Sequence, residues 1–256
     1  MDAVAAMLRA AHGAVALTGA GISTESGLPD FRSPGGLWTG VDPMRVASLS
    51  AFRRDPGAFY AFYQDRLSRL GGAQPNPAHR ALADLERANR LRAVITQNVE
   101  GLHQAAGSRH VLELHGSLCY AACADCGVRT DIALLANALA AGRTPQCPAC
   151  AGPLRPDVVL FGELLPPTVF AEADALCRAA DLMLVVGSSL TVTPAADLPQ
   201  TVLDAGGVLV IVNREPTPYD VDAAVILRAD AGSVLPAIAS LAAGALRETA
   251  EEEHHA

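Results

Sequence analysis

Four of the six cysteines form two pairs, and two residues separate the thiols within each pair: Cys123 with Cys126, and Cys147 with Cys150. Twenty residues lie between the pairs. This is zinc-ribbon spacing, in which each pair points two thiolates the same way and both pairs complete a tetrahedron. The alternatives are two disulfides or four buried thiols, and a cytoplasmic chain disfavours disulfides. We predict one structural Zn²⁺, and we interpret Cys119 and Cys177 as small buried apolar residues.

A glycine-rich turn, Gly19, Ala20 and Gly21, directly follows the first apolar run. Glycines at such a turn let the backbone approach a pyrophosphate. A dehydrogenase fingerprint would place a third glycine where Thr24 stands, and then a helix, a second strand and an acidic ribose anchor. Here the glycines lead into residues 25–32, which we expect to be a loop. The sequence therefore indicates a dinucleotide pocket covered by a mobile segment, with a ligand-free tight turn as the alternative.

Polar residues follow the other expected strands. Asn98 comes after one strand and His115 after the next. Because the carboxyl ends of parallel strands line one crevice, both side chains should lie near the glycine turn. Imidazole titrates near neutrality, so His115 is the candidate general base, although a structural histidine is the alternative. His103 is expected to pack or cap. Possible ribose and adenine contacts follow two later strands: Gly187, Ser188, Ser189, Asn213, Arg214 and Glu215.

Short apolar runs alternate with longer helical patterns. This predicts an α/β fold, with a Rossmann-like, doubly wound parallel sheet and helices on both faces. Several runs are nearly continuous Val, Ile and Leu, as buried parallel strands should be. The expected strands are residues 14–18, 92–96, 111–114, 157–161, 182–187, 208–212 and 224–227. The expected helices are residues 3–11, 77–89, 166–180, 194–204 and 232–243.

Two segments interrupt this alternation and should form a smaller lobe. Residues 32–77 begin as a Gly/Pro/Ser-rich loop and continue into an aromatic helix at residues 56–70, a helical module. Residues 118–155 hold five of the six cysteines, a zinc-ribbon module. The dinucleotide-binding sheet domain would then comprise residues 1–31, 78–117 and 156–247. Residues 248–256 are polar and acidic, and we expect a flexible tail.

The charge balance excludes one class of partner. The chain has 19 basic and 27 acidic residues, a net charge of −8, and all 19 basic residues are arginine. Nucleic-acid binding normally needs clustered cations, so we expect no nucleic-acid partner. No run of about 18 apolar residues exists, so no membrane association is expected. At 256 residues the chain can bury a full core in one or two domains. We expect a cytoplasmic monomer.

Longer stretches resemble the sirtuins, which are NAD-dependent protein lysine deacylases. The matching motifs occur in family order over about residues 10–245: GAGISTESGLPDFRSPGGLW (19–38), TQNVEGLH (96–103), HGSL (115–118), the two cysteine pairs, RPDVVLFGE (155–163), GSSLTVTPAADLP (187–199) and VNREPT (212–217). The resemblance implies a large Rossmann-like NAD domain. It also implies a small lobe with a helical module and a zinc ribbon, and an acyl-lysine peptide bound between the lobes.

The resemblance also implies which residues bind the co-substrate NAD. The nicotinamide-ribose half would contact Ala20, Asp30, Phe31, Arg32, Gln97 and Asn98. The adenosine half would contact Gly187, Ser188, Asn213 and Ala231. Further contacts would come from Gly19, Gly21, Thr24, Glu100, Ser189, Arg214 and Glu215.

The implied reaction moves the acyl group from lysine to ADP-ribose. The peptide would lie as an added strand beside the segment with Val159, Phe161 and Gly162. By the resemblance His115 is the general base, and Asn98 is the second catalytic residue. The implied products are nicotinamide, O-acetyl-ADP-ribose and free lysine. Zinc would shape the small lobe and take no part in the chemistry.

The sequence departs from the family pattern at specific positions. Glu100 stands where the family usually has Asp, which adds a methylene near the nicotinamide pocket. Tyr63 and Arg66 lie three apart on an expected helix and so share a face. Such a pair marks sirtuins that remove succinyl, malonyl or glutaryl groups, because Arg binds carboxylates with two donors. The alternative is that Tyr63 packs in the module and Arg66 is solvated. Thr24 stands where acidic-acyl enzymes often have Ala.

Three classes of function remain open at this point. The first is a deacetylase, with desuccinylase or demalonylase activity as its variant. The second is a mono-ADP-ribosyltransferase that uses the same C1′ electrophile with another nucleophile. The third is a non-catalytic NAD-binding and zinc-ribbon module, against which Asp30, Asn98 and His115 argue.

Overall fold

The computed structural model describes residues 1–252, with side chains described as far as residue 244. Its larger lobe is a six-stranded parallel sheet in the order β3-β2-β1-β7-β8-β9. The strand order reverses between β1 and β7, which opens a crevice at the carboxyl ends of these two strands. The strands are β1 (Ala14–Thr18), β2 (Ala93–Thr96), β3 (Val111–Glu113), β7 (Leu182–Val186), β8 (Val208–Val212) and β9 (Ala223–Leu227).

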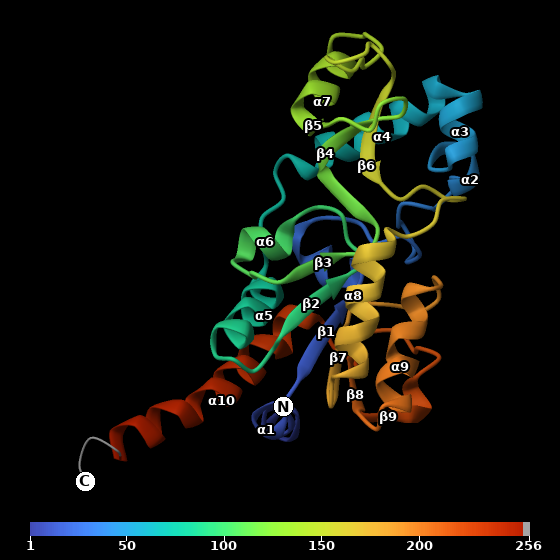
Figure 1. The fold of residues 1–256 in the computed structure, drawn as a ribbon. Helices are drawn as coiled ribbons and strands as arrows, with labels where there is room; N and C mark the ends of the chain where they lie inside the picture. The colour runs from blue at the N-terminus through green and yellow to red at the C-terminus, as the bar shows by residue number, and fades with distance from the viewer. Residues whose placement is uncertain (253–256) are drawn as a thin grey trace.

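Helices cover both faces of this sheet. β1, β2 and β7 are buried along their whole length, and alternate residues of β1 belong to different cores. In Figure 1, α5 and α10 lie on one side of the strands, with α8 and α9 on the other. The first side carries α1 (Asp2–Ala10), α5 (Pro77–Arg87) and α10 (Ala231–Glu252), and the second carries α8 (Pro167–Arg178) and α9 (Leu198–Asp204). Among the described residues, no helix has the length and apolar character that crossing a membrane would take.

The smaller lobe combines a helical module with an antiparallel sheet in the order β5-β4-β6 (Figure 1). Phe52, Phe59, Tyr60 and Tyr63 pack together and form the aromatic core of the helical module. The elements of this lobe are α2 (Pro43–Val46), α3 (Leu49–Arg54), α4 (Pro56–Leu70), β4 (Gly116–Cys123), β5 (Arg129–Asp131), α7 (Ile132–Ala140) and β6 (Leu154–Val158). Short elements elsewhere are η1 (Ala20–Ser26), α6 (Leu102–Ala106), η2 (Ala195–Asp197) and η3 (Asp220–Asp222).

One predicted strand is wrong. Residues 157–161 were expected in the parallel sheet, but β6 ends at Val158 and pairs antiparallel with β4 in the small sheet. The apolar run that follows is buried in part by the aromatic module, since Val158 and Leu160 belong to its core. A short apolar run indicates that the segment is buried, but it does not indicate whether the segment belongs to the large sheet or to the smaller lobe. The other six expected strands are confirmed to within about a residue at each end.

The predictions for the two unpaired cysteines and for the C-terminal segment can also be compared with the structure. Cys177 is buried on α8, as predicted, but the prediction for Cys119 is wrong, because this residue is exposed where the pairing of β4 is irregular. The segment 248–256 was expected to be a flexible tail. Helix α10 continues through Glu252, and residues 253–256 lie outside the described residues. The domain boundaries remain a prediction.

Three glycines bring the loops after β1 and β7 into direct contact. The Gly21 amide donates to the carbonyl oxygen of Gly187 over 2.8 Å, and the Gly19 amide donates to that of Val186 over 3.1 Å. A Cβ on Gly19 or Gly21 would lie 2.8 Å from the backbone of Gly187. Gly187 itself has φ +60°, a conformation that other residues rarely adopt. The floor of the crevice is therefore backbone packed on backbone.

This packing predicts the effect of adding one methyl group. Gly21→Ala should lower the free energy of unfolding by about 1–3 kcal/mol, because the added Cβ overlaps backbone that cannot move without separating β1 from β7. Gly72→Ala is the matched control, since its Cβ would meet no atom within 4 Å. Urea denaturation of both variants tests this. Equal midpoints for the two variants would contradict the packing argument.

Candidate active site and metal cluster

A cavity of about 900 Å³ lies at the carboxyl end of the parallel sheet and extends to the smaller lobe. Its walls come from the loops after β1, β2, β7 and β8, from α4, and from the segment after β6. Most of the predicted site residues line it together: Gly19, Ala20, Gly21, Asp30, Phe31, Arg32, Tyr63, Arg66, Gln97, Asn98, His115, Val159, Phe161, Gly162, Gly187, Ser188, Ser189, Asn213, Arg214, Glu215 and Ala231.

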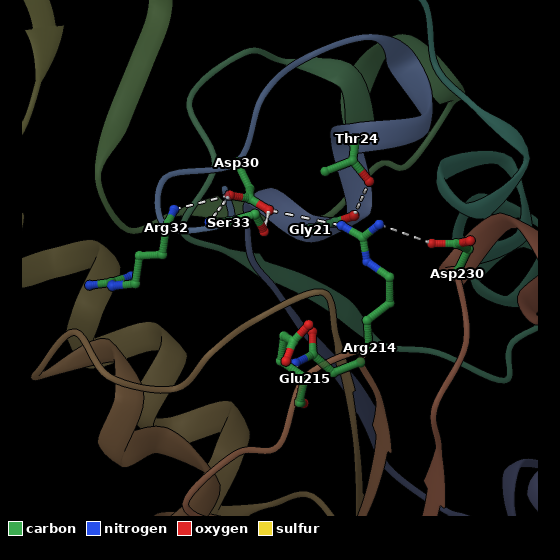
Figure 2. A network of polar contacts seen from close by, with 9 residues as sticks. Gly21, Thr24, Asp30, Arg32, Ser33, Arg214, Glu215 and Asp230 are labelled. Atoms are coloured by element: carbon green, nitrogen blue, oxygen red, sulfur yellow. Dashed lines mark hydrogen bonds and ion pairs between the residues drawn. The ribbon is translucent and has the colours of Figure 1, made fainter. Parts of the chain in front are cut away.

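Two residues expected to contact the cofactor do not line this cavity. The Thr24 hydroxyl donates to the Gly21 carbonyl over 3.0 Å and so closes the turn of η1 (Figure 2). The Glu100 carboxylate turns back to its own loop. It accepts from the Ser23 hydroxyl at 2.5 Å and from the Val99 amide at 3.0 Å. Both side chains stabilise the loops from behind, so the expectation of direct contact finds no support in this geometry.

His115 faces the cavity with one nitrogen and the backbone with the other. Its Nδ1 lies 2.9 Å from the carbonyl oxygen of Gln97. A carbonyl only accepts, so Nδ1 carries the proton and Nε2 keeps its lone pair. Burial lowers the pKa of His115 more than this hydrogen bond raises it. The ring is therefore a neutral imidazole at pH 7, with an unprotonated nitrogen available as a base.

Asn98 and Gln97 tie the end of β2 to both glycine loops. The Asn98 amide nitrogen donates to the Gly19 carbonyl and to the Ser23 hydroxyl, each over 3.2 Å. Gln97 Nε2 donates to the Ser188 hydroxyl over 2.9 Å. Asn98 is only 5% exposed, so these bonds fix its orientation. The polar residues that follow three different strands thus form one connected wall.

A relay of buried hydrogen bonds supports this wall from behind. The backbone amide of Asn76 donates to His79 Nδ1 at the capping box of α5. His79 Nε2 therefore carries the proton and faces Ser23 Oγ at 3.4 Å. Ser23 in turn donates to Glu100. Burial lowers the pKa of His79 to about 4 and that of His103 to about 3, which keeps both rings neutral.

Neither Ser23 nor His79 was singled out from the sequence as a site residue. The available signal was the Asn-Pro-x-His spacing at residues 76–79, which reads as a helix cap. His103 was expected to pack or cap. It is buried, and its Nε2 donates to the Thr18 hydroxyl over 2.9 Å, because that hydroxyl already donates to Thr96.

Arg214 sits between the carboxylates of Asp30 and Asp230 (Figure 2). Its guanidinium lies 3.9 Å from Asp30 and 3.6 Å from Asp230. Asp30 also accepts from the amides of Arg32 and Ser33, at 3.0 and 2.8 Å. Burial raises the pKa of Asp30, but a hydrogen bond from the Ser33 hydroxyl, these two amide bonds and Arg214 together outweigh it and hold the pKa below its usual range. The Asp30 carboxylate is therefore charged and anchors the start of the loop over the cavity.

Aromatic rings form the wall nearest the smaller lobe. Trp38 stacks on Phe62 with centroids 5.7 Å apart, and lies 5.3 Å from Phe31 and 6.2 Å from Phe161. Trp38 was not predicted as a site residue, although it is the single tryptophan and falls in the glycine-rich loop. This wall is apolar and suited to excluding water.

Tyr63 and Arg66 lie together on α4 and line the same cavity. Burial raises the pKa of Tyr63 to about 12, so its hydroxyl stays protonated. The Arg66 guanidinium lies 5.2 Å from the centroid of the Phe31 ring. Among the described residues no carboxylate is hydrogen-bonded to Arg66, although the Glu100 carboxylate is near enough to attract its charge. Arg66 is thus half-buried, and is not solvated as Arg69 is.

The four paired cysteines form a separate cluster in the smaller lobe. Their sulfur atoms all lie within 4.8 Å of one another, with Cys123 and Cys150 at 3.5 Å and Cys126 and Cys147 at 3.7 Å. These separations are far too long for a disulfide, whose S–S bond is about 2.05 Å. Tetrahedral zinc with bonds of about 2.3 Å places its sulfur ligands about 3.8 Å apart. The donor set and its geometry therefore fit Zn²⁺ with four thiolates.

Backbone amides also point at these sulfurs. The amides of Asp125, Ala149 and Gly152 each lie 3.4 Å from a cysteine sulfur. Such N–H groups stabilise thiolate charge on a metal ligand. None of the four cysteines lines the cavity, which is consistent with a structural role.

The motifs and the geometry can be compared with known proteins. The family model described as the Sir2 family matches residues 19–194. An NAD-dependent protein deacetylase of Pyrobaculum aerophilum is 45% identical over 236 residues, which is 92% of each chain. The chain belongs to the Sir2 family.

Solved Sir2 structures match the fold over nearly its full length. A Sir2 homologue in complex with NAD has a TM-score of 0.90 and 40% identity, and the match covers 96% of this chain and 95% of that one. A Sir2 variant with a deacetylated p53 peptide and 3′-O-acetyl ADP-ribose has a TM-score of 0.88 and 40% identity, over 92% and 95% of the two chains. The Rossmann-like fold with a second small sheet is thereby confirmed, as is the expected resemblance.

The metal cluster of this Sir2 chain generates a prediction. Purified protein should contain about one zinc per chain. Cys150→Ser should lose most of that zinc and lower the melting temperature by about 5–10 °C. The reason is that zinc binds the folded chain, so its binding free energy adds to the free energy of unfolding. Elemental analysis and thermal denaturation measure both effects. Cys119→Ser, which lies outside the cluster, is the matched control and should keep its zinc. The assignment would be contradicted if wild-type protein without zinc melted at the same temperature as wild-type protein with zinc.

Proposed function

We propose that this chain is an NAD-dependent protein lysine deacylase that transfers the acyl group of acyl-lysine to ADP-ribose. The observation that carries the proposal is His115, whose unprotonated Nε2 faces a cavity with a glycine-lined floor. The products are nicotinamide, O-acyl-ADP-ribose and the free lysine. The family membership and the reaction named for the Pyrobaculum relative support it.

The residues of the cavity fit NAD. Gly19, Gly21 and Gly187 leave backbone exposed on the floor, where a pyrophosphate can approach without meeting a Cβ. Gln97, Asn98 and Asp30 would hold the nicotinamide-ribose half. Ser188, Asn213 and Ala231 would hold the adenosine half. When bound, NAD supplies an electrophilic C1′ that the acyl oxygen attacks as nicotinamide leaves.

The chain's own side chains account for the remaining steps. His115 removes a proton from a ribose hydroxyl through Nε2, and its bond to Gln97 keeps the ring in the required tautomer. Phe31 and Trp38 exclude water from the reacting centre, so that water does not compete with the acyl oxygen for C1′. Asn98 is held by two hydrogen bonds and presents its remaining polar atoms to the cavity. All three roles need residues fixed before the substrate arrives.

Free main-chain groups support a peptide substrate. The segment after β6 leaves the amide and carbonyl of Gly162 and Leu164 without hydrogen bonds among the described residues. An extended peptide could pair with this segment as an added strand. Phe161 cannot contribute, because its amide and carbonyl already bond Ala47 and Leu49. The acidic net charge supports a protein rather than a nucleic-acid partner, and we extend the proposal to a monomer in the cytoplasm.

A second candidate concerns the acyl group. Tyr63 and Arg66 present a hydroxyl and a guanidinium to the cavity, and in the described residues no carboxylate is hydrogen-bonded to Arg66. A succinyl, malonyl or glutaryl group would bring the missing carboxylate. This observation favours acidic-acyl removal as an activity beside deacetylation.

The role of His115 predicts a loss of turnover and a pH profile. His115→Ala should lower kcat on acetyl-lysine peptide by at least about 100-fold while leaving the fold intact. Because burial lowers the pKa of His115, the base is protonated only in more acidic solution, so wild-type turnover should fall with decreasing pH at a midpoint below 6.5. Steady-state kinetics from pH 5 to 9 measure both. His12→Ala, at an exposed position, is the control. Undiminished turnover in His115→Ala would overturn the role.

The acyl pocket predicts a selective effect. Arg66→Met should raise the KM for succinyl-lysine peptide about tenfold or more and leave acetyl-lysine turnover nearly unchanged, because only the acidic acyl group loses a charged hydrogen bond. Parallel assays with the two peptides provide the measurement. Arg69→Met is the matched control, since Arg69 is exposed and paired with Asp65. An equal change for both peptides would show that Arg66 does not bind the carboxylate.

A further inference from the structure

The turn that follows β6 carries the most exposed apolar side chain of the cavity rim. Leu164 lines the cavity and is 90% exposed, and Phe161 on the same turn is 40% exposed. A single exposed leucine is ordinary on a protein surface. Two apolar side chains three residues apart at the mouth of one cavity form a patch that a ligand can cover. We call Phe161 and Leu164 the rim patch.

The backbone under the rim patch is held rigidly. Glu163 forms two parallel bonds with the Arg155 guanidinium, each over 2.9 Å, and also accepts from the Leu160 amide at 2.9 Å. The Glu163 amide donates back to the Leu160 carbonyl over 2.9 Å. Phe161 is paired with Ala47 on the other side. Leu164 is therefore presented from a fixed turn, and little backbone entropy is lost when a partner covers it.

The charged side chain of this turn is paired within the protein. Glu163 is its single ionisable residue, and Arg155 neutralises it. The opposite wall of the mouth contributes Val192, Thr193 and Pro194, none of which carries a charge. A charged side chain placed between these walls would lose water and gain no partner, while an apolar one would gain the hydrophobic contact.

We propose that the rim patch makes this chain select substrate polypeptides with a bulky apolar residue within two positions of the acyl-lysine. The inference rests on the proposed function, because it needs the peptide to enter this mouth. The free main-chain groups of Gly162 and Leu164 place an added strand beside Leu164, and its side chains then lie within reach of the leucine. Leu164 is thus a specificity residue that touches the substrate outside its acyl group.

The test uses acetyl-lysine peptides that differ at one position. Each peptide carries Leu, Ser or Asp at one of the positions from −2 to +2, and kcat/KM is measured at saturating NAD for wild type, Leu164→Ser and Val221→Ser. Val221 is the matched control, since it is also 90% exposed but does not line the cavity. At one position at least, wild type should prefer Leu over Asp by about tenfold, mainly through KM. Leu164→Ser should reduce this preference to about threefold or less, and Val221→Ser should keep it.

The possible results separate the two proposals. Turnover of all peptides at equal kcat/KM, or a preference that survives Leu164→Ser, would overturn the role of the rim patch and leave the deacylase proposal standing. If no peptide is turned over, the deacylase proposal fails. In that case fluorescence anisotropy with labelled forms of the same peptides tests the rim patch separately. The Leu peptide should bind wild type about tenfold tighter than the Asp peptide does. Leu164→Ser should bind the two peptides with similar affinity.

Discussion

The contact between the glycine loops after β1 and β7 is the constraint on which the site depends. The two loops lie closer than any Cβ would allow, and amide-to-carbonyl bonds fasten them together. Two polar side chains of the crevice are bonded to this junction. Asn98 bonds the first loop at Gly19, and Gln97 bonds the second at Ser188. A shift of one loop would therefore displace both groups, together with the carbonyl that orients His115.

Two strands of the smaller lobe connect His115 and the rim patch to the cysteine cluster. β4 begins at Gly116, the residue after His115, and pairs there with Val158 at the end of β6. The same two strands lead to the cysteine cluster at their other ends, since β4 ends at Cys123 and β6 begins shortly after Cys150. A metal at that cluster would therefore hold the register of the strands that carry the base and the rim patch, while remaining outside the cavity.

Much of this could be predicted from the sequence, because the decisive signals are local. Continuous apolar runs predicted six strands of the parallel sheet, and the cysteine spacing predicted a cluster that the geometry now fits. The failures share a physical cause. The run at 157–161 is buried by aromatic residues far away in sequence, and the relay through His79 depends on which groups lie behind the wall. Likewise, the motif that holds Glu100 did not indicate that its carboxylate would bond Ser23; its contact with the cofactor stays a prediction. Position in the chain does not determine which way a side chain turns.

The aromatic wall has a spectroscopic consequence. Trp38 is the single indole of the chain, and its ring lies among side chains from three segments: Phe31 of the cofactor loop, Phe62 of α4 and Phe161 of the rim patch. All tryptophan emission of this protein therefore originates at one place, the aromatic wall of the cavity where these three segments meet. The wavelength and intensity of that emission report on water entering this wall. The molecule thus carries its own optical label at its binding site, and titrations can be followed without attaching a dye.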